Sequence, residues 1–551
     1  MGAKTKKAIH FLEAPNPRGL DDKQLFVENE DLKPVEAGRR LWKARNFATF
    51  WIADGFNLNT WYIASAMLPA LSWWQAWICV WIGYTFTGFL VAAGARPGGV
   101  YHIGFPVFAR GSFGIFGSLW PVFNRAAMAC IWTGVQSWIG GQCVVLLLRS
   151  LAPSYNNLHN SMPASSGTTT KDFLGFFLFI LMHIPCVWLP VEKVRHFFTV
   201  KAIVAPIAGL SYMAWVIHRA NGIGPIIHQP AQSSGSALGW HMVDGIMSSI
   251  ANFATLICNA SDFSRFAHKP SNAVIPQVIA IPMTFGLVSF VGIIVASSSQ
   301  AIYGEAYWDP LTMLSKMLEE NPYDSGTRAG VFFISAAFII AQLGTNVAAN
   351  TISAGSDLTA LLPRFMTIRR GGYVAVIVAF AMCPWNLLKS SNNFTTYLAS
   401  YSVFLSAIIG VLFCDYFLIR RGRLHVPDLY TLSSSGFAHY WKGIHWRAYV
   451  AYICGIIPNA PGFGAAVGAT DVALGAKRIY QLNFFVGFIV SFGLYYILCR
   501  FVGTVPGMER QGWHEDLHYE PDDDVSEVGG SEIVRASSSD KDLGSDLTKM
   551  A

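Results

Sequence analysis

Two residues of one apolar run, Trp132 and Gln136, are suited to holding a flat ring between them. They lie four positions apart, so on a helix they share one face. The indole offers a π surface for stacking, and the carboxamide offers one acceptor and two donors to the edge of a ring. The same spacing also serves helix packing, so the pair indicates a binding site only together with other residues.

A later apolar run carries two amides one helical turn apart, Asn346 and Asn350. The small residues around them, Gly344, Ala348 and Ala349, let neighbouring helices approach closely, which is a purely structural explanation of the stretch. It does not explain the amides, because a polar side chain inside a bilayer needs a partner or a cavity. We therefore expect each of the two amides to find a partner or to line a cavity.

Two apolar runs are interrupted by polar residues. The first contains Asp54 directly before Gly55, and the sixth contains Asn252 and Asn259. A charge at the centre of a bilayer costs about 2.5–3.5 kcal/mol on insertion scales, so Asp54 is not expected to face lipid. Interrupted helices five apart are typical of transporters built from two five-helix units of opposite topology.

The elements that must position these residues are membrane-spanning helices. The 551 residues are 53% hydrophobic and only 13% charged, about half the charge of a soluble protein. This composition excludes a soluble enzyme, a nucleic-acid-binding protein and a disordered scaffold. Runs of about 20 apolar residues predict an all-α polytopic membrane protein with twelve transmembrane helices, at residues 47–69, 74–94, 119–149, 172–190, 199–217, 239–260, 273–301, 330–353, 371–386, 394–418, 448–467 and 482–502.

The basic residues orient these spans. Lys and Arg gather before the first span and in every second connection after it, which predicts that those segments, and with twelve spans both termini, are cytoplasmic. Both tails are polar and expected to be solvated, and Lys541 and Lys549 are candidate sites of ubiquitin-dependent turnover. The predicted parts are an N-terminal segment at 1–46, a five-helix repeat at 47–217, an inverted repeat at 239–418, two further helices at 448–502 and an acidic, Ser-rich tail at 503–551.

Other classes of membrane protein are less compatible with the pattern. None of the nine cysteines has metal-ligand spacing, so no metal site is predicted, and no other cofactor is indicated. No nucleophile–base set lies at mid-membrane depth, which disfavours an enzyme. The polar residues cluster at one depth, which disfavours a channel. A nutrient sensor on the same fold stays open, although longer signalling extensions would be expected of it.

Several stretches resemble the nucleobase–cation symport family, and within it the fungal uracil, allantoin and uric acid permease branch. The resemblance runs from about residue 30 to about residue 510. It implies a LeuT-like fold, with two inverted five-helix repeats plus two C-terminal helices, that works by alternating access. The matching stretches are WIADGFNLNTW (51–61), YHIGFPVFARGSFGIFGSLWPVFNRAAMACIW (101–132) with the TGVQSWIGGQCV that follows, SDFSRFAHKPS (261–271) and GTNVAANTISAGSDLTALLP (344–363).

The resemblance also implies roles for individual residues. In sodium-coupled relatives, oxygens of the first and eighth spans bind the cation, and the matching positions here are Ala53, Phe56, Ala341, Gly344 and Thr345. The implied substrate contacts are the stacking ring Trp132 with its neighbour Gln136, a second aromatic Phe253, the edge-reading amide Asn350 with its neighbour Asn346, and Asn57.

The cation position departs from the sodium-coupled pattern. Gly344 stands where those relatives have a hydroxyl residue, so a sodium site would lose a ligand. This departure favours proton over sodium coupling. Asp54 is the candidate titrating group, and it is equally explained as a cap of the helix break.

The predicted function is proton-coupled uptake of a small planar heterocycle across the plasma membrane. Uracil, allantoin and uric acid all fit, because each presents alternating carbonyl and N–H groups. A nucleoside or a vitamin of the thiamine or pyridine type is the alternative cargo. Phe394 and Leu398, near the start of the tenth span, are a candidate outer gate, whereas Asp357 and Asp415 are expected to be structural.

Overall fold

The computed structural model describes residues 13–516 except 17–18, 189–190, 224–226, 504, 507 and 509–511, with only the backbone of 191–197. Helices account for all regular elements in this part of the chain. Its α-helices are α2 (Asp22–Val27), α3 (Ala44–Gly55), α4 (Leu58–Ser65), α5 (Trp73–Tyr101), α6 (Phe105–Phe113), α7 (Leu119–Leu151), α8 (Thr170–Val187), α9 (Val191–Arg219), α11 (Gly235–Asn252), α12 (Ala254–Cys258), α13 (Ala260–Ser264), α14 (Pro270–Tyr303), α15 (Pro310–Glu320), α16 (Ser325–Thr345), α17 (Ile352–Leu361), α18 (Ile368–Ala381), α19 (Ser391–Phe413), α20 (Trp446–Ile456), α21 (Ala460–Ala466), α22 (Leu474–Gln481) and α23 (Asn483–Phe501). Two π-helical segments, Asn346–Thr351 and Cys414–Ile419, follow α16 and α19, and 3₁₀ turns lie at Ala37–Arg39, Pro153–Asn157, Ala164–Ser166, Pro384–Asn386, Val426–Leu429, Phe437–His439 and Ile457–Asn459.

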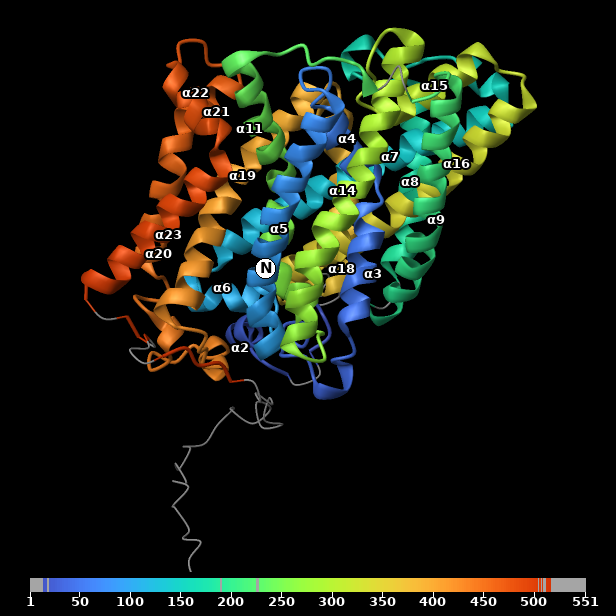
Figure 1. Ribbon diagram of the computed structural model, residues 1–551. Coiled ribbons are helices and arrows are strands. Elements are labelled where there is room, and N and C mark those ends of the chain that lie inside the picture. Colours follow the sequence, from blue (N-terminus) through green and yellow to red (C-terminus); the bar gives the residue numbers. More distant parts are fainter. Residues whose placement is uncertain are drawn as a thin grey trace, which may run out of the picture. The chain divides into compact units, whose positions relative to one another are not determined.

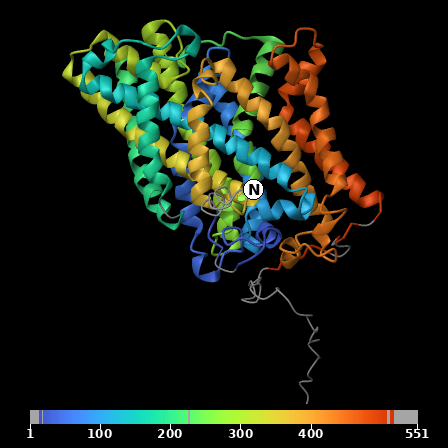
Figure 2. The same ribbon diagram turned by 180° about the vertical axis from the view of Figure 1, so that it is seen from behind.

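The long helices lie side by side as a bundle (Figures 1 and 2), with α5 packed along α14, α7 along α16 and α19 along α23. Each of the twelve predicted spans falls on one or more of these helices. Within the described residues, eight segments are long and apolar enough to cross a membrane. The other four predicted spans fall on broken or short helices, at 47–69, 239–260, 371–386 and 448–467; the longest helix of the second of these, α11, is also less apolar. The count of twelve therefore stays a prediction.

The first span is broken because its sequence favours a turn at mid-depth. Helix α3 ends at Gly55, where an added Cβ would lie 2.6 Å from Thr284 Cγ2 of α14, so only glycine permits this approach. Asn57 then caps α4: its Oδ1 accepts the N–H of Thr60 at 3.2 Å, and its Nδ2 donates to the Asp54 carbonyl. The break predicted around Asp54 is therefore present.

The sixth span is broken as well, between α11, α12 and α13, at Phe253 and Asn259. The two breaks face each other, since Asn59 Nδ2 donates to Asn252 Oδ1 at 2.8 Å. A third irregularity was not predicted: the eighth span passes through a π-helical segment that contains Asn346 and Asn350. Such wide turns are frequent at functional sites.

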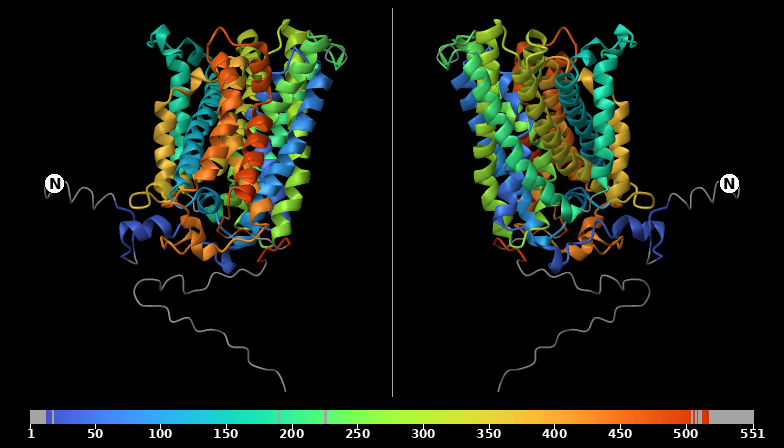
Figure 3. Two further views of the ribbon diagram at one scale, coloured as in Figure 1. Left: turned by 90° about the vertical axis from the view of Figure 1, so that its left-hand side faces the viewer. Right: turned by 90° about the vertical axis from the view of Figure 1, so that its right-hand side faces the viewer.

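The N-terminal segment differs from the solvated tail that we predicted. Val27, Leu32 and Val35 are buried, and α2 lies against one end of the bundle (Figure 3). The guanidinium of Arg110 on α6 donates to the carbonyl oxygens of Val27 and Phe26 at 3.0 and 2.9 Å. A few apolar side chains and backbone acceptors thus suffice to fix a polar segment.

The start of the C-terminal tail also packs on the bundle. The Trp513 ring stacks on Phe417 with centroids 5.8 Å apart. Glu515, whose side chain is 3% exposed, pairs with Arg96 and accepts from Tyr416 Oη at 2.7 Å. Within the stretch predicted to be solvated, 510–551, Glu515 is therefore held against the bundle, whereas Trp513 is half exposed. Lys541 and Lys549 lie outside the described residues.

Candidate functional site

A small central cavity lies where the two broken helices meet α7 and the π-helical segment of the eighth span. Its volume is about 30 Å³, room for about one water molecule, so a ring would enter only after the helices move apart. Six predicted site residues come together here, from three separate stretches of sequence. The lining residues are Asp54, Asn57, Asn59, Trp132, Gln136, Asn252, Thr255, Leu256, Phe285, Thr345, Ala349 and Asn350.

The amides of this cavity are hydrogen-bonded to other amides. Gln136 Oε1 accepts from Gln342 Nε2 at 2.9 Å, and Asn350 Nδ2 donates to Asn346 Oδ1 at 3.1 Å. Gln342 is fully buried, and its own Oε1 has no hydrogen-bond partner. Bonds between neutral amides are exchangeable, so a ligand with carbonyl and N–H groups can replace them.

Asn346 positions Asn350 and does not line the cavity. Its Nδ2 donates to the Thr133 carbonyl at 3.0 Å and to Ser137 Oγ at 2.9 Å, both on α7. Its Oδ1 then holds the Asn350 amide. The direction of Asn346, which the sequence left open, is thus toward α7.

Phe253 does not line the cavity, contrary to the expected second stacking ring. It sits at the junction of α11 and α12 and is fully buried. Its ring packs against Trp51, Tyr84 and Phe285, with centroids 5.5, 5.6 and 4.8 Å away. Phe285 of α14 is the aromatic residue that faces the cavity from that side.

A buried lysine occupies the predicted cation position. Lys201 of α9 is 1% exposed, and its Nζ donates to Thr345 Oγ1. Asp54 lines the same cavity, its Oδ1 has no hydrogen-bond partner, and it is close enough to Lys201 for the two charges to interact. The four other residues matched to the cation position are buried without lining the cavity: Ala53, Phe56, Ala341 and Gly344.

Aromatic side chains pack together at two places, one on each predicted side of the membrane. On the predicted cytoplasmic side, the Phe50 ring lies 5.0 Å from Phe263, 5.6 Å from Phe198 and 5.8 Å from Trp42, centroid to centroid. On the other side, the predicted gate residues Phe394 and Leu398 are fully buried.

The aromatic packing on the outer side involves further contacts of the tenth span. Phe394 stacks on Trp308, centroids 6.1 Å apart, and meets the Tyr62 ring edge-on at 6.2 Å. About two helical turns after Phe394 on α19, Tyr401 Oη donates to the Ala251 carbonyl at 2.8 Å. The bond joins α19 to the outer half of the broken sixth span.

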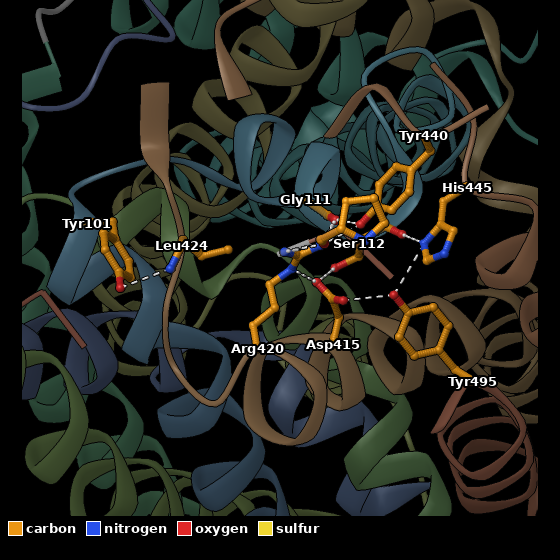
Figure 4. Close-up of polar contacts among 10 residues, drawn as sticks. Tyr101, Gly111, Ser112, Asp415, Arg420, Leu424, Tyr440, His445 and Tyr495 are labelled. Atoms are coloured by element: carbon orange, nitrogen blue, oxygen red, sulfur yellow. Dashed lines mark hydrogen bonds and ion pairs between the residues drawn. The ribbon is translucent and has the colours of Figure 1, made fainter. Parts of the chain in front are cut away.

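A second buried polar cluster, the Asp415 network, shares no residue with the cavity lining, and Figure 4 shows its contacts. Asp415 Oδ2 accepts from Arg420 Nε at 2.8 Å and from Ser112 Oγ at 3.0 Å, and its Oδ1 accepts from Tyr495 Oη at 2.8 Å. The remaining members are Tyr440, whose Oη donates to the Gly111 carbonyl at 2.7 Å, and His445, whose ring lies parallel to that of Tyr440 at 3.9 Å.

Comparison with known proteins decides the family. Residues 34–487 match the family described as "Permease for cytosine/purines, uracil, thiamine, allantoin". The chain belongs to this permease family. It is similar to the allantoin permease of Saccharomyces cerevisiae, with 44% identity over 91% of this chain and 80% of the relative. It is also similar to the uridine permease of that yeast, with 42% identity over 88% and 76%. Its fold is that of Mhp1, a nucleobase-cation-symport-1 family transporter solved in a closed conformation with bromovinylhydantoin bound (TM-score 0.69, 22% identity, 88% of this chain and 98% of that chain).

Membership makes the permease a multi-pass membrane transporter and not an enzyme. Lys201 and Gln342, which contact residues of the cavity lining, were not predicted as site residues, although the sequence marks both as polar groups in apolar runs. Lys201 is a charge near the start of the fifth predicted span, and Gln342 is an amide one position after Ala341. Polar side chains inside membrane spans are functional candidates by default. Phe285 carried no such signal, because one more apolar ring in an apolar helix is unremarkable.

Proposed function

We propose that the protein is a proton-coupled carrier for a small planar heterocycle, namely uracil, allantoin and/or uric acid. The observation that carries this proposal is the convergence of one indole and two carboxamides, Trp132, Gln136 and Asn350, on a single mid-depth cavity. The ring would stack on the indole and exchange its carbonyl and N–H groups for the bonds that the amides now make with Gln342 and Asn346.

The amides and the indole are proposed to have different roles because their interaction free energies differ. Aromatic stacking contributes about 0.5–1.5 kcal/mol beyond burial. A buried amide left without a partner costs about 1–3 kcal/mol. A ring with the wrong edge would leave Gln136 or Asn350 unpaired, so the amides should determine selectivity while Trp132 supplies affinity.

Coupling is assigned to Asp54 and Lys201. The ammonium of Lys201 is bonded to Thr345, where a sodium ion would need that hydroxyl, and Gly344 offers none. We propose that Lys201 supplies the positive charge of this position and that Asp54, open on one oxygen, gains and loses the proton. Uptake should then persist when choline replaces sodium. Asp54→Asn should flatten its pH profile, and an unchanged profile would remove Asp54 from the coupling step.

The test of the proposed cargo is uptake of radiolabelled uracil in cells that lack their own permeases. Excess allantoin, uric acid, uridine and thiamine are the competitors. Block by allantoin or uric acid supports the proposal. Block by uridine or thiamine alone favours the nucleoside or vitamin alternative, and no uptake of any labelled candidate by a surface-localised protein favours a sensor.

The remaining proposals concern the location of the protein, its turnover and its outer gate. The proposed site of action is the plasma membrane with both termini cytoplasmic, which epitope tags on each tail would check in intact and permeabilised cells. Turnover through Lys541 and Lys549 is tested by the double Arg variant, whose surface lifetime should lengthen. The gate proposal for Leu398 and Phe394 predicts that Leu398→Ala broadens the substrate range, and an unaltered range would refute it.

A further inference from the structure

A second and larger cavity lies on the predicted outer side of the central one. Its volume is about 340 Å³, within the size range of small-molecule sites. Four elements form it: α4, α11, α19 and the α22–α23 corner. Its lining residues are Ile63, Ala66, Met67, Ala70, His241, Asp244, Gly245, Met247, Ser248, Ala251, Asn392, Thr395, Thr396, Ala399, Tyr480, Gln481 and Asn483.

The polar wall of this outer cavity is rich in hydrogen-bond acceptors. Asp244 accepts from Gln481 Nε2 at 2.9 Å through one carboxylate oxygen. Gln481 is held in that direction because its Oε1 accepts from Arg478 Nη1 at 2.7 Å. A carboxylate has about four acceptor positions, so the Gln481 bond leaves most of them for a ligand.

A second acceptor is buried in the same wall. Asn483 is 2% exposed, and its Oδ1 has no hydrogen-bond partner. Its Nδ2 is committed to the Tyr480 carbonyl at 3.0 Å, so the amide is fixed and its oxygen is left over. A buried acceptor without a partner costs about 1–3 kcal/mol, which a ligand carrying N–H donors would recover.

Another part of the lining is apolar. Ile63, Met67 and Met247 line it, and Met side chains adapt to the shape of what they contact. Together, the walls offer a flexible apolar face and two acceptors. A small neutral heterocycle with N–H groups matches this chemistry.

The outer cavity adjoins the central one along two helices. On α4, Ile63 lies one turn beyond Asn59 of the central cavity, and on α11, Ala251 directly precedes Asn252 of the central cavity. The Tyr401–Ala251 hydrogen bond stands at this boundary. A molecule in the outer cavity would therefore need to pass that bond to reach Trp132.

The outer cavity and the predicted gate side chains lie on different faces of helix α19. Thr395, Thr396 and Ala399 face the outer cavity. Phe394 and Leu398 are each turned by about 100° around the helix from their neighbours Thr395 and Ala399, and they face Tyr62 and Trp308 or the buried core. An occupant of the outer cavity would thus contact α19 without touching the gate side chains.

We infer that the outer cavity is a second binding site for the carried heterocycle, in which Asp244 and Asn483 accept N–H groups of the ring. This inference rests on the proposed function. The site would hold the molecule against α4, α11 and α19 before the Tyr401–Ala251 contact opens.

The test counts bound radiolabelled uracil per chain on the purified full-length protein, with labelled allantoin as a second probe. Wild type should bind two molecules per chain. Gln136→Ala weakens the central site, so that at a uracil concentration just sufficient to saturate wild type it stays largely empty, and Ala399→Phe fills the outer one, so each variant should bind about one molecule. The double variant should bind almost none. Ala473→Phe is the matched control, since Ala473 is exposed and outside the lining, and it should still bind two.

Asp244→Asn keeps the shape of the side chain and removes the charged acceptor. It should weaken binding at the outer cavity, measured in the Gln136→Ala background, at least fivefold. Binding at the central cavity, measured in the Ala399→Phe background, should stay unchanged. One molecule per wild-type chain, with none on Gln136→Ala, would overturn the inference while uracil uptake by wild type upholds the proposed function. A wild-type chain that neither takes up nor binds uracil or allantoin would overturn both.

Discussion

The central cavity and the Asp415 network are both buried polar clusters, and they are built in opposite ways. In the cavity, neutral amides bond to one another, and Asp54 Oδ1 and Gln342 Oε1 have no partner. In the network, one carboxylate takes three hydrogen bonds, one of them from a guanidinium (Figure 4). Charge-assisted bonds are roughly twice as strong as neutral ones.

This difference indicates which cluster can change. The network joins α6, the π-helical segment after α19, the 426–445 connection and α23, and no small molecule could replace its ion pair without leaving a buried charge. The cavity amides can exchange partners at little cost. Burial of polar groups alone therefore does not identify a binding site; exchangeable bonds beside a cavity do.

The largest effect is expected from breaking the network at Asp415. Asp415→Ala leaves the guanidinium of Arg420 buried and unpaired, since both side chains are 1% exposed, which costs about 3–5 kcal/mol. Thermal unfolding of the purified protein should show a large loss of stability, with surface expression and uptake falling together. The double variant Asp415→Leu/Arg420→Met is the control and should recover stability, because no charge is left unpaired. Uptake lost without any loss of stability would place Asp415 in transport instead.

The network should also respond to pH through His445. Burial lowers the pKa of His445 to about 4, below its ordinary value of 6.5, so the folded protein holds this imidazole neutral. The unfolded chain binds the proton first as pH falls, so the stabilisation is complete above pH 6.5 and is lost on the way down to about pH 4. Thermal stability of wild type should fall over this window, and less so in His445→Gln. Equal falls in both proteins would assign the effect to other groups.

The sequence predicted the cavity better than it predicted its surroundings. Gln136 and Asn350 stood out as amides inside apolar runs, and the family resemblance, more than their spacing, singled them out together with Trp132. The break at Asp54 was identifiable because a carboxylate also stands inside an apolar run. Asn346 could be found but not oriented, because its direction depends on Thr133 and Ser137 of a different helix.

Other features depend on contacts that no local pattern encodes. Phe253 was misplaced because a helix junction sets the direction of its ring, and one residue's difference at such a junction turns a side chain by about 100°. The docked stretch around Trp513 and Glu515 looks like any polar tail until Arg96 and Phe417 are brought beside it. The Asp415 network was predicted only as a structural aspartate, since Arg420 is a near neighbour in sequence but Tyr495 and Ser112 come from segments about 80 and 300 residues away.

In the cavity, Gln136→Ala should reduce transport strongly, while stability falls only by the loss of one neutral hydrogen bond. The change removes the partner of Gln342 and the acceptor and donors offered to the ring, worth about 1–3 kcal/mol, or roughly a 5- to 150-fold loss of uptake efficiency. Uptake and thermal unfolding measured on the same preparation decide it. Near-normal uptake would show that Gln136 does not contact the substrate. A large loss of stability would show that the Gln136–Gln342 bond is structural, like the bonds of the Asp415 network.

The smallest effect is expected from Trp132→Leu, which keeps an apolar side chain on α7 and removes only the stacking surface. The loss of about 0.5–1.5 kcal/mol corresponds to a rise in KM of ~2- to 13-fold. Selectivity among uracil, allantoin and uric acid should stay as in wild type, because the amides that read the ring edge are untouched. Trp132→Phe is the matched control and should lie between wild type and Trp132→Leu. A change in selectivity larger than the change in KM would mean that the indole, and not the amide pair, distinguishes one ring from another.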